Sequence, residues 1–141
     1  MPTILVVEDF DDTRLMMKMW LSRIGYRVLE AETGQEGVEM AQKERPDLII
    51  MDMMMPGMNG NAFLRIIRND QRRKYLPVVV LTALNSGEVL RSVSELGVQE
   101  WLLKADYSGQ QLIDAVDRLS YPPAGPRASN EWQNVRWSQQ N

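Results

Sequence analysis

The sequence predicts an α/β fold built around a doubly wound, five-stranded parallel sheet. Short apolar runs rich in β-branched residues alternate with longer amphipathic segments, and five such pairs fit between residues 4 and 119. Three of the runs are continuously apolar, as in strands that helices cover on both faces. Units that alternate in this way form a parallel sheet joined by right-handed crossovers.

Each predicted strand is a short run that ends at a polar or turn residue. The second run is weaker than the others because charged residues interrupt it, and the fifth is short. A strand of four to six residues is ordinary for a sheet of this kind. The predicted strands are 4–7, 27–31, 48–51, 78–81 and 100–103.

The first helix is predicted from a capping carboxylate and a helical spacing of apolar residues. Asp11 or Asp12 would satisfy the free backbone N–H groups at its start, and Gly25 would end it in a left-handed conformation. Its apolar face is expected to consist of Met16, Met19, Trp20 and Ile24.

Capping boxes and glycines mark the later helices. Thr33 with Glu36 opens a helix that runs toward Lys43, and a further helix lies around 62–68. Equivalent boxes open the last two helices, and Gly97 ends the first of these. The boxes are Asn85 with Glu88 and Ser108 with Gln111, and the apolar faces are Val89, Leu90, Val93 and Leu96, then Leu112, Val116 and Leu119.

Composition excludes several classes of chemistry. The 141 residues contain no cysteine and no histidine, which rules out Cys/His metal sites and Ser-His or Cys-His catalysis. A metal here must be a hard cation bound by oxygen. The net charge of −3 gives no general attraction to nucleic acid or acidic membranes. The basic run Arg72–Lys74 is expected to be a solvated loop rather than a phosphate-binding patch.

Chemistry-bearing side chains follow four of the predicted strands. Glu8 and Asp9 follow the first strand, Asp52 the third, Thr82 the fourth and Lys104 the fifth. The carboxyl ends of parallel strands meet at one edge of a sheet, so these side chains should lie together. Clustered carboxylates repel one another unless a cation sits among them, and Mg²⁺ suits such a site. Lys104 would then attract a phosphoryl oxygen, and Thr82 would supply a hydroxyl group.

In this order and at these distances, the motifs resemble the receiver domain of two-component response regulators, with its flavodoxin-like (βα)₅ fold. The resemblance covers residues 3–119. The matching segments are Ile4–Asp9, Gly25–Tyr26, Ala31–Gly34, Pro46–Asp52, Met55–Gly60, Leu81–Ala83 and Lys104.

The resemblance implies a role for each site residue. Asp52 would be the phosphoacceptor, receiving a phosphoryl group from a sensor histidine kinase or a histidine phosphotransfer protein. Mg²⁺ would be bound by Asp9, Asp52 and the backbone carbonyl of Met54, with Glu8 acting through a water molecule. The phosphoryl group would be bound by Thr82, Lys104 and the backbone N–H of Ala83.

The resemblance also implies a switch that acts on other proteins. Thr82 would move toward the phosphoryl group and Trp101 would swing inward, which would change the surface formed by the fourth helix, the fifth strand and the fifth helix. A static, half-buried packing role for Trp101 stays open. So does a receiver-like interaction module that does not switch by phosphorylation. The chain is not expected to be an enzyme. Its downstream target is expected to be a protein, which the sequence does not identify. Homodimers are common in this family, so a homodimer is possible.

Two positions depart from the family pattern. Ala105 stands where the family has a proline after a cis peptide bond, and a trans bond is expected here because a cis bond before a non-proline residue costs about 3 kcal/mol. In the family, the side chains two positions after the phosphoacceptor and two after the threonine flank the path of the hydrolytic water, and here both are apolar, as Met54 and Leu84. We hypothesise that they lengthen the lifetime of the phosphorylated state.

Two unrelated classes fit the residues poorly. A haloacid-dehalogenase-type phosphatase needs an acidic residue two positions after its nucleophile, where this chain has Met54. A flavodoxin-like flavin carrier needs a phosphate-binding loop after the first strand, where Glu8–Asp12 would repel phosphate.

The chain divides into an expected receiver domain at 1–120 and a tail at 121–141. Prolines at 122, 123 and 126 and a polar composition predict a disordered tail. The alternative is a docking segment anchored by Trp132 and Trp137. No segment resembles a signal peptide, a membrane span or a helix-turn-helix, so we expect a cytoplasmic protein that binds neither membranes nor nucleic acid directly.

Overall fold

The computed structural model describes residues 2–53, 57–82, 91, 95, 97–104 and 107–120. The expected fourth helix falls largely outside this range, as does the tail, so neither prediction is tested. The described strands are β1 (Thr3–Val7), β2 (Arg27–Ala31), β3 (Leu48–Asp52), β4 (Val78–Thr82) and β5 (Glu100–Leu103). The helices are α1 (Asp11–Arg23), α2 (Gly34–Glu44), α3 (Gly60–Asn69), the 3₁₀ helix η1 (Gln71–Arg73) and α5 (Gly109–Ser120).

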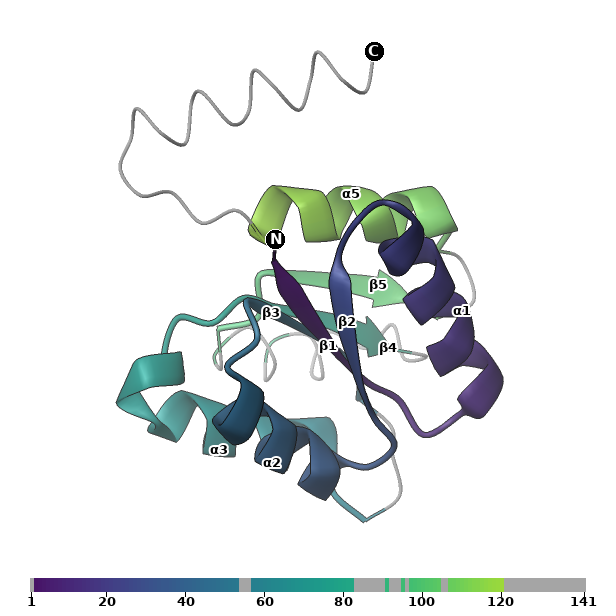
Figure 1. The fold of residues 1–141 in the computed structure, drawn as a ribbon. Helices are drawn as coiled ribbons and strands as arrows, with labels where there is room; N and C mark the ends of the chain where they lie inside the picture. The colour runs from purple at the N-terminus through teal and green to yellow at the C-terminus, as the bar shows by residue number, and fades with distance from the viewer. Residues whose placement is uncertain are drawn as a thin grey trace, which may run out of the picture.

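The five strands form one parallel sheet in the order β2-β1-β3-β4-β5, which confirms the predicted fold class (Figure 1). The chain moves outward from β1 to β2 and then returns to place β3 on the other side of β1. This reversal creates a switch point between β1 and β3, where ligands bind at the carboxyl ends of the strands in folds of this type.

The two faces of the sheet support separate hydrophobic cores. Figure 1 shows α1 and α5 covering one face and α2 and α3 covering the other. Alternate residues of each strand point to opposite faces, so Val6 and Ile50 contribute to the α1/α5 core while Val7 and Met51 contribute to the α2/α3 core. Every residue of β1, β3 and β4 is buried. The continuously apolar strands therefore lie where their composition predicted.

Helix α1 corrects the sequence prediction in two respects. Its N-cap is Phe10, which makes no side-chain hydrogen bond, while Asp11 and Asp12 lie inside the first turn. There their charges still favour the positive end of the helix dipole. Met17 and Leu21 are the apolar side chains buried against the sheet, whereas the predicted face is largely exposed at Met16, Met19 and Ile24. Apolar residues occupy both faces of this helix, so periodicity alone could not select the buried one.

The other helix starts agree more closely with the sequence. Ser108 and Gln111 form a reciprocal capping box, with side-chain to backbone distances of 2.8 and 3.2 Å. Thr33 caps α2 by accepting a hydrogen bond from the N–H of Glu36 at 3.0 Å. The Glu36 carboxylate accepts a hydrogen bond from the N–H of Glu32 instead of the N–H of Thr33. Only the Thr33 half of the predicted capping box is therefore formed.

In the basic run at 72–74, Arg72 and Lys74 are exposed as the sequence predicted, but Arg73 is not. Arg73 belongs to η1 and is only 5% exposed. Its guanidinium donates to the carbonyl oxygens of Ala41 and Gln42, at 2.9 and 3.0 Å, and forms an ion pair with Asp70. Those carbonyls belong to the last turn of α2, which has no intrahelical partners for them. Arg73 therefore caps α2 from a separate element.

We predict that Arg73→Ala lowers the free energy of unfolding by about 2–4 kcal/mol, because it removes the donor to the carbonyls of Ala41 and Gln42 and the ion-pair partner of the Asp70 carboxylate. Arg72→Ala is the matched control: its side chain is largely exposed, and a change of no more than about 0.5 kcal/mol is expected. Urea unfolding midpoints measure both. Equal, small losses would show that Arg73 is not a cap.

Candidate functional site

The predicted site residues meet at the carboxyl edge of the sheet. Glu8 follows β1, Asp52 and Thr82 are the last residues of β3 and β4, and Lys104 follows β5. Backbone hydrogen bonds fix these ends relative to one another, including Lys104 N–H to Thr82 O at 2.8 Å. Glu8, Asp52 and Thr82 are buried, and Asp9 is exposed at the rim.

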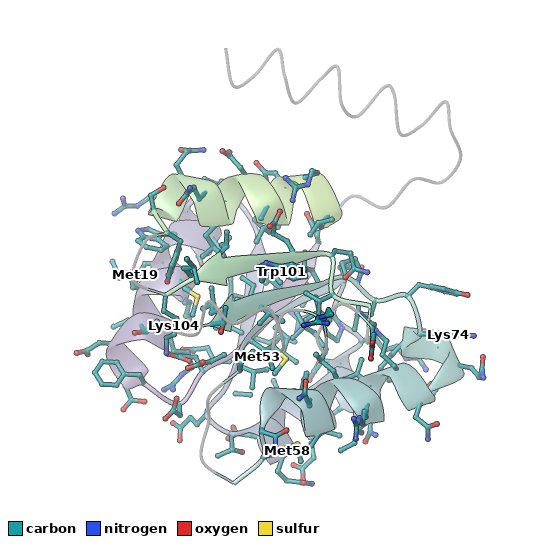
Figure 2. The ribbon with its side chains drawn as sticks, turned by 180° about the vertical axis from the view of Figure 1, so that it is seen from behind. Met19, Met53, Met58, Lys74, Trp101 and Lys104 are labelled. Carbon is teal, nitrogen blue, oxygen red and sulfur yellow. The ribbon has the colours of Figure 1, made fainter. Side chains whose placement is uncertain are left out.

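Three carboxylates and one ammonium group form the centre of the site. Glu8, Asp9 and Asp52 each offer an oxygen, and these oxygens lie within 4.8 Å of one another. The Nζ of Lys104 lies 2.7 Å from Asp52 Oδ2 and 3.7 Å from Glu8 Oε1. Figure 2 labels Lys104, which follows the last residue of β5. The four side chains come from three different strands, so the sheet itself assembles them.

The electrostatics of this centre are unfavourable for three negative charges. Burial raises the pKa of Glu8 to about 8, and its hydrogen bond with Asp52 and the Asp52 charge act in the same direction, against the opposing effect of Lys104. Burial by itself would lower the pKa of Lys104, but the hydrogen bond and charge of Asp52, followed by Glu8, raise it. Without a cation, a third negative charge on Glu8 is therefore disfavoured at this edge of the sheet.

The donor set fits a hard divalent cation. Neither buried oxygen of Glu8 accepts a hydrogen bond from the described residues, although the protonated acid can donate one to Asp52. A buried polar atom without a donor is unusual and calls for a water molecule or an ion. Oxygen ligands at this spacing suit Mg²⁺, which is held by one or two carboxylates together with water.

Several predicted site features lie outside the described residues. These are the carbonyl of Met54, the N–H of Ala83, the side chain of Leu84 and the peptide bond before Ala105. Trp101 is described: it is half-buried and packs against the core between the sheet and the α2/α3 layer (Figure 2).

Arg14 is a site-supporting residue that sequence reasoning missed. Its guanidinium is buried and donates to the backbone carbonyl of Glu8 at 2.8 Å, while Asp11, Glu30 and Glu32 supply carboxylates within 3.5 Å. It thereby ties α1 to the turn that carries Glu8 and Asp9. The only signal was its position on the face shared with Met17 and Leu21, which the periodicity did not identify.

Gly60 and Tyr107 also border the site. A Cβ at Gly60 would lie 2.2 Å from the sulfur of Met53, so glycine lets α3 begin directly against the residue after Asp52. The Gly60 N–H donates to Met53 O at 3.2 Å and fixes that approach. Burial, followed by the charge of Glu8, raises the pKa of Tyr107, which places this phenol near the carboxylates.

Among the described helices, none has the length and apolar character needed to cross a membrane.

The chain matches the family model of the response regulator receiver domain over residues 4–117. A similar protein is the transcriptional regulatory protein AfsQ1 of Streptomyces coelicolor, with 36% identity over 74% of this chain but only 45% of AfsQ1. Another is the chemotaxis protein CheY of Pseudomonas aeruginosa, with 31% identity over 82% of this chain and 94% of CheY.

Solved structures show the same likeness. The chemotaxis protein CheY4 of Vibrio cholerae superimposes with a TM-score of 0.79 at 33% identity, covering 84% of this chain and 98% of CheY4. The receiver domain of the sensor histidine kinase PA1611 from Pseudomonas aeruginosa gives a TM-score of 0.77 at 26% identity, covering 86% of this chain and 98% of that domain. That structure has a magnesium ion coordinated in its active-site cleft.

We predict that Arg14→Met lowers the free energy of unfolding by about 2–3 kcal/mol, because the Glu8 carbonyl loses its buried charged donor. Lys18→Met is the control on the same helix: Lys18 pairs with Glu30 at 3.1 Å but is half-exposed, and such pairs contribute about 0–1 kcal/mol. Chemical denaturation compares the two. A smaller loss for Arg14→Met than for Lys18→Met would contradict the supporting role.

Proposed function

The chain belongs to the response regulator receiver family, and on that premise we propose that it accepts a phosphoryl group on Asp52 in a Mg²⁺-dependent reaction. The observation that carries the proposal is the contact of Lys104 Nζ with Asp52 Oδ2 at 2.7 Å, inside a cluster of three carboxylates. This arrangement positions Asp52 and provides positive charge where a phosphoryl oxygen would arrive.

Receiver domains are phosphorylated by histidine kinases, so the proposed donor is a sensor histidine kinase or a histidine phosphotransfer protein. A carboxylate oxygen of Asp52 attacks the phosphorus and forms an O–P bond. The N–P bond of the donor phosphohistidine breaks, and its electron pair returns to the imidazole. Reactions of this kind depend mainly on positioning and charge neutralisation.

The remaining side chains neutralise and orient the transferred group. Lys104 exchanges its contact with Asp52 for one with a phosphoryl oxygen, and the Thr82 hydroxyl donates to another. Asp9, Asp52 and the Met54 carbonyl would bind Mg²⁺, with Glu8 orienting a water molecule and the Ala83 N–H completing the phosphoryl contacts. When bound, Mg²⁺ offsets the charges of the carboxylates and the phosphoryl oxygens.

The proposed output is a change of the surface formed by the fourth helix, β5 and α5. Movement of Thr82 toward the phosphoryl group and reorientation of Trp101 would bias two pre-existing states of that surface. The half-buried position of Trp101 at the edge of the α2/α3 core supports this role, because a ring held by partial packing can exchange between two environments. The consequence would be altered binding of a downstream protein.

The first prediction from the proposed function concerns covalent modification. Incubation with Mg²⁺ and a small acyl-phosphate donor should add the mass of one phosphoryl group to the wild type and nothing to Asp52→Asn. Asp12→Asn is the matched control, because this exposed carboxylate lies outside the cluster, and it should be modified as the wild type is. Intact mass spectrometry after incubation at neutral pH measures the added mass in the wild type and in both variants.

The absence of modification in a folded wild type would favour the alternative function, a receiver-like interaction module that does not switch by phosphorylation. Modification of Asp52→Asn to the same extent as the wild type would place the phosphoacceptor elsewhere.

The second prediction concerns the cation alone. Mg²⁺ at ten times its dissociation constant should stabilise the protein by about 1.4 kcal/mol, since it binds only the folded site. A chelator should reverse the gain, and Asp9→Asn should reduce it strongly, whereas Asp12→Asn should leave it unchanged. Thermal unfolding with and without Mg²⁺ provides the measurement. An equal gain in Asp9→Asn would remove Asp9 from the ligand set.

A further inference from the structure

Helix α1 presents an exposed face that is apolar in the middle and charged at its ends. Five of the seven large hydrophobic side chains that are exposed in the described part of the chain lie on α1 or directly beside it. Met19, labelled in Figure 2, is 53% exposed. Exposed apolar surface concentrated in this way commonly marks a contact surface. Six side chains of this face line a shallow groove of about 210 Å³, and we call them the α1 stripe: Asp12, Leu15, Met16, Met19, Trp20 and Arg23.

The α1 stripe faces away from the sheet and follows a single line along the helix. Successive residues of an α-helix are about 100° apart, so all six positions fall within about 70° of that line. Met17 and Leu21, which are buried against the sheet, lie on the opposite side of the helix. Positions 12, 16, 19 and 23 are spaced by alternating steps of four and three residues, as in the seam between two helices of a coiled coil. The stripe therefore has the form of a helix-pairing surface.

The α1 stripe is also symmetric about its midpoint, which lies between positions 17 and 18. Positions 12 and 23 are equally distant from that point, and so are positions 15 and 20 and positions 16 and 19. The outermost pair consists of an acidic and a basic residue, Asp12 and Arg23, and both inner pairs are apolar. A surface with this pattern is complementary to a second copy of itself that runs in the opposite direction, which is the requirement for a two-fold symmetric contact.

We propose that this chain forms a two-fold symmetric dimer in which the α1 stripes of two copies pack against each other in antiparallel orientation. The two-fold axis crosses the stripe at its midpoint. Asp12 of each copy then lies level with Arg23 of the other copy, and Met16 of each copy lies beside Met19 of the other. The proposal does not depend on phosphorylation of Asp52.

The charges at the ends of the stripe select this orientation. Neither Asp12 nor Arg23 forms an ion pair with another described residue, so both are available to a second copy. The antiparallel arrangement gives two pairs of opposite charge, and it places the positive end of each helix dipole beside the negative end of the other. A parallel arrangement would place like charges together at both ends, which is unfavourable.

The apolar centre of the stripe suits a close contact between two helices. Met16 and Met19 would fill the middle of the contact, and methionine side chains adapt to irregular partners. The Trp20 side chains of the two copies would line one edge, and the Leu15 side chains the other. Trp20 is already held by its own domain, because its ring packs edge-on against Tyr107 at a centroid distance of 6.4 Å. Little of its side-chain freedom is therefore lost on association.

The small size of the contact sets the expected strength of the dimer. The exposed residues of the neighbouring helix α5 are all polar, so the apolar surface on this side of the sheet is confined to α1. A contact made by one helix from each copy falls below the total of about 1,200 Å² at which stable interfaces begin, and contacts of that size are typical of weak association. We therefore expect a dissociation constant of about 10–100 µM.

The test is sedimentation velocity of the intact chain from about 10 µM to about 1 mM protein, a range that brackets the expected dissociation constant. The dimer fraction of the wild type should rise across this range. Asp12→Lys and Arg23→Glu should each raise the dissociation constant by about tenfold or more, because each turns both pairs of opposite charge into pairs of like charge. Both positions are exposed, so folding is retained.

Two recoveries test the alignment itself. The double variant Asp12→Lys, Arg23→Glu should dimerise as the wild type does, because it exchanges the charges and restores both opposite pairs. An equimolar mixture of the two single variants should also dimerise, since every contact between the two different chains again joins opposite charges. Arg65→Glu, an exposed arginine on α3, is the control for net charge and should leave the dissociation constant unchanged.

The apolar contact is tested by Met19→Ser, which should also raise the dissociation constant by about tenfold or more, because the middle of the contact loses its packing. Ile66→Ser is the matched control. Ile66 is an apolar residue of α3 that is 40% exposed, and its replacement should leave the dimer unchanged.

A wild type that stays monomeric up to about 1 mM would overturn the proposal. A dimer that is equally stable in Met19→Ser and in both single charge variants would overturn it as well, since its interface would lie elsewhere on the chain. Loss in the single charge variants without recovery in the double variant and in the mixture would refute the antiparallel alignment.

Discussion

The buried pair of Glu8 and Asp52 is the constraint on which the rest of this site depends. Two carboxylates without access to water cannot both be charged at low cost. Lys104 contacts Asp52 at 2.7 Å but Glu8 only at 3.7 Å, so the single ammonium group offsets the charge of Glu8 poorly, and burial raises the pKa of that carboxyl. The end of the sheet therefore holds more negative than positive charge. A divalent cation would offset the excess negative charge, whereas a phosphoryl group would increase it, so binding of the cation would favour binding of the phosphoryl group.

The parallel sheet is what makes this unfavourable cluster affordable. Continuous apolar strands bury their side chains on both faces, and this burial supplies most of the stability of the fold. Strand ends from distant parts of the sequence converge at the switch point between β1 and β3. Supporting contacts then hold individual ends in place: Arg14 binds the Glu8 carbonyl, and Gly60 lets α3 approach Met53. These contacts lie outside the cluster, so they fix its geometry without adding ligands to it.

The sequence predicted the features that depend on local pattern. Apolar runs located all five strands, and the polar residues after them located Glu8, Asp52, Thr82 and Lys104, because strand ends in a parallel sheet share one edge. Features that depend on which of two possible faces packs in the folded protein, or on contacts between distant elements, could not be predicted from local pattern. Helix α1 has apolar residues on two faces, and only tertiary packing chose Met17 and Leu21. Arg73 appeared in a charged run, yet its role depends on carbonyls of α2 that lie more than thirty positions earlier.

Helix α1 connects the site with exposed apolar side chains. Phe10 is the N-cap residue of α1 and follows Asp9 directly, so exposed apolar surface begins next to a rim carboxylate of the cluster. Asp9 is exposed and Lys104 is partly exposed, which makes this rim the side from which the carboxylates are reached. A protein donor that approaches Asp52 across the β1–α1 turn would contact Phe10 and Leu15, whereas a small phosphorylated molecule need not.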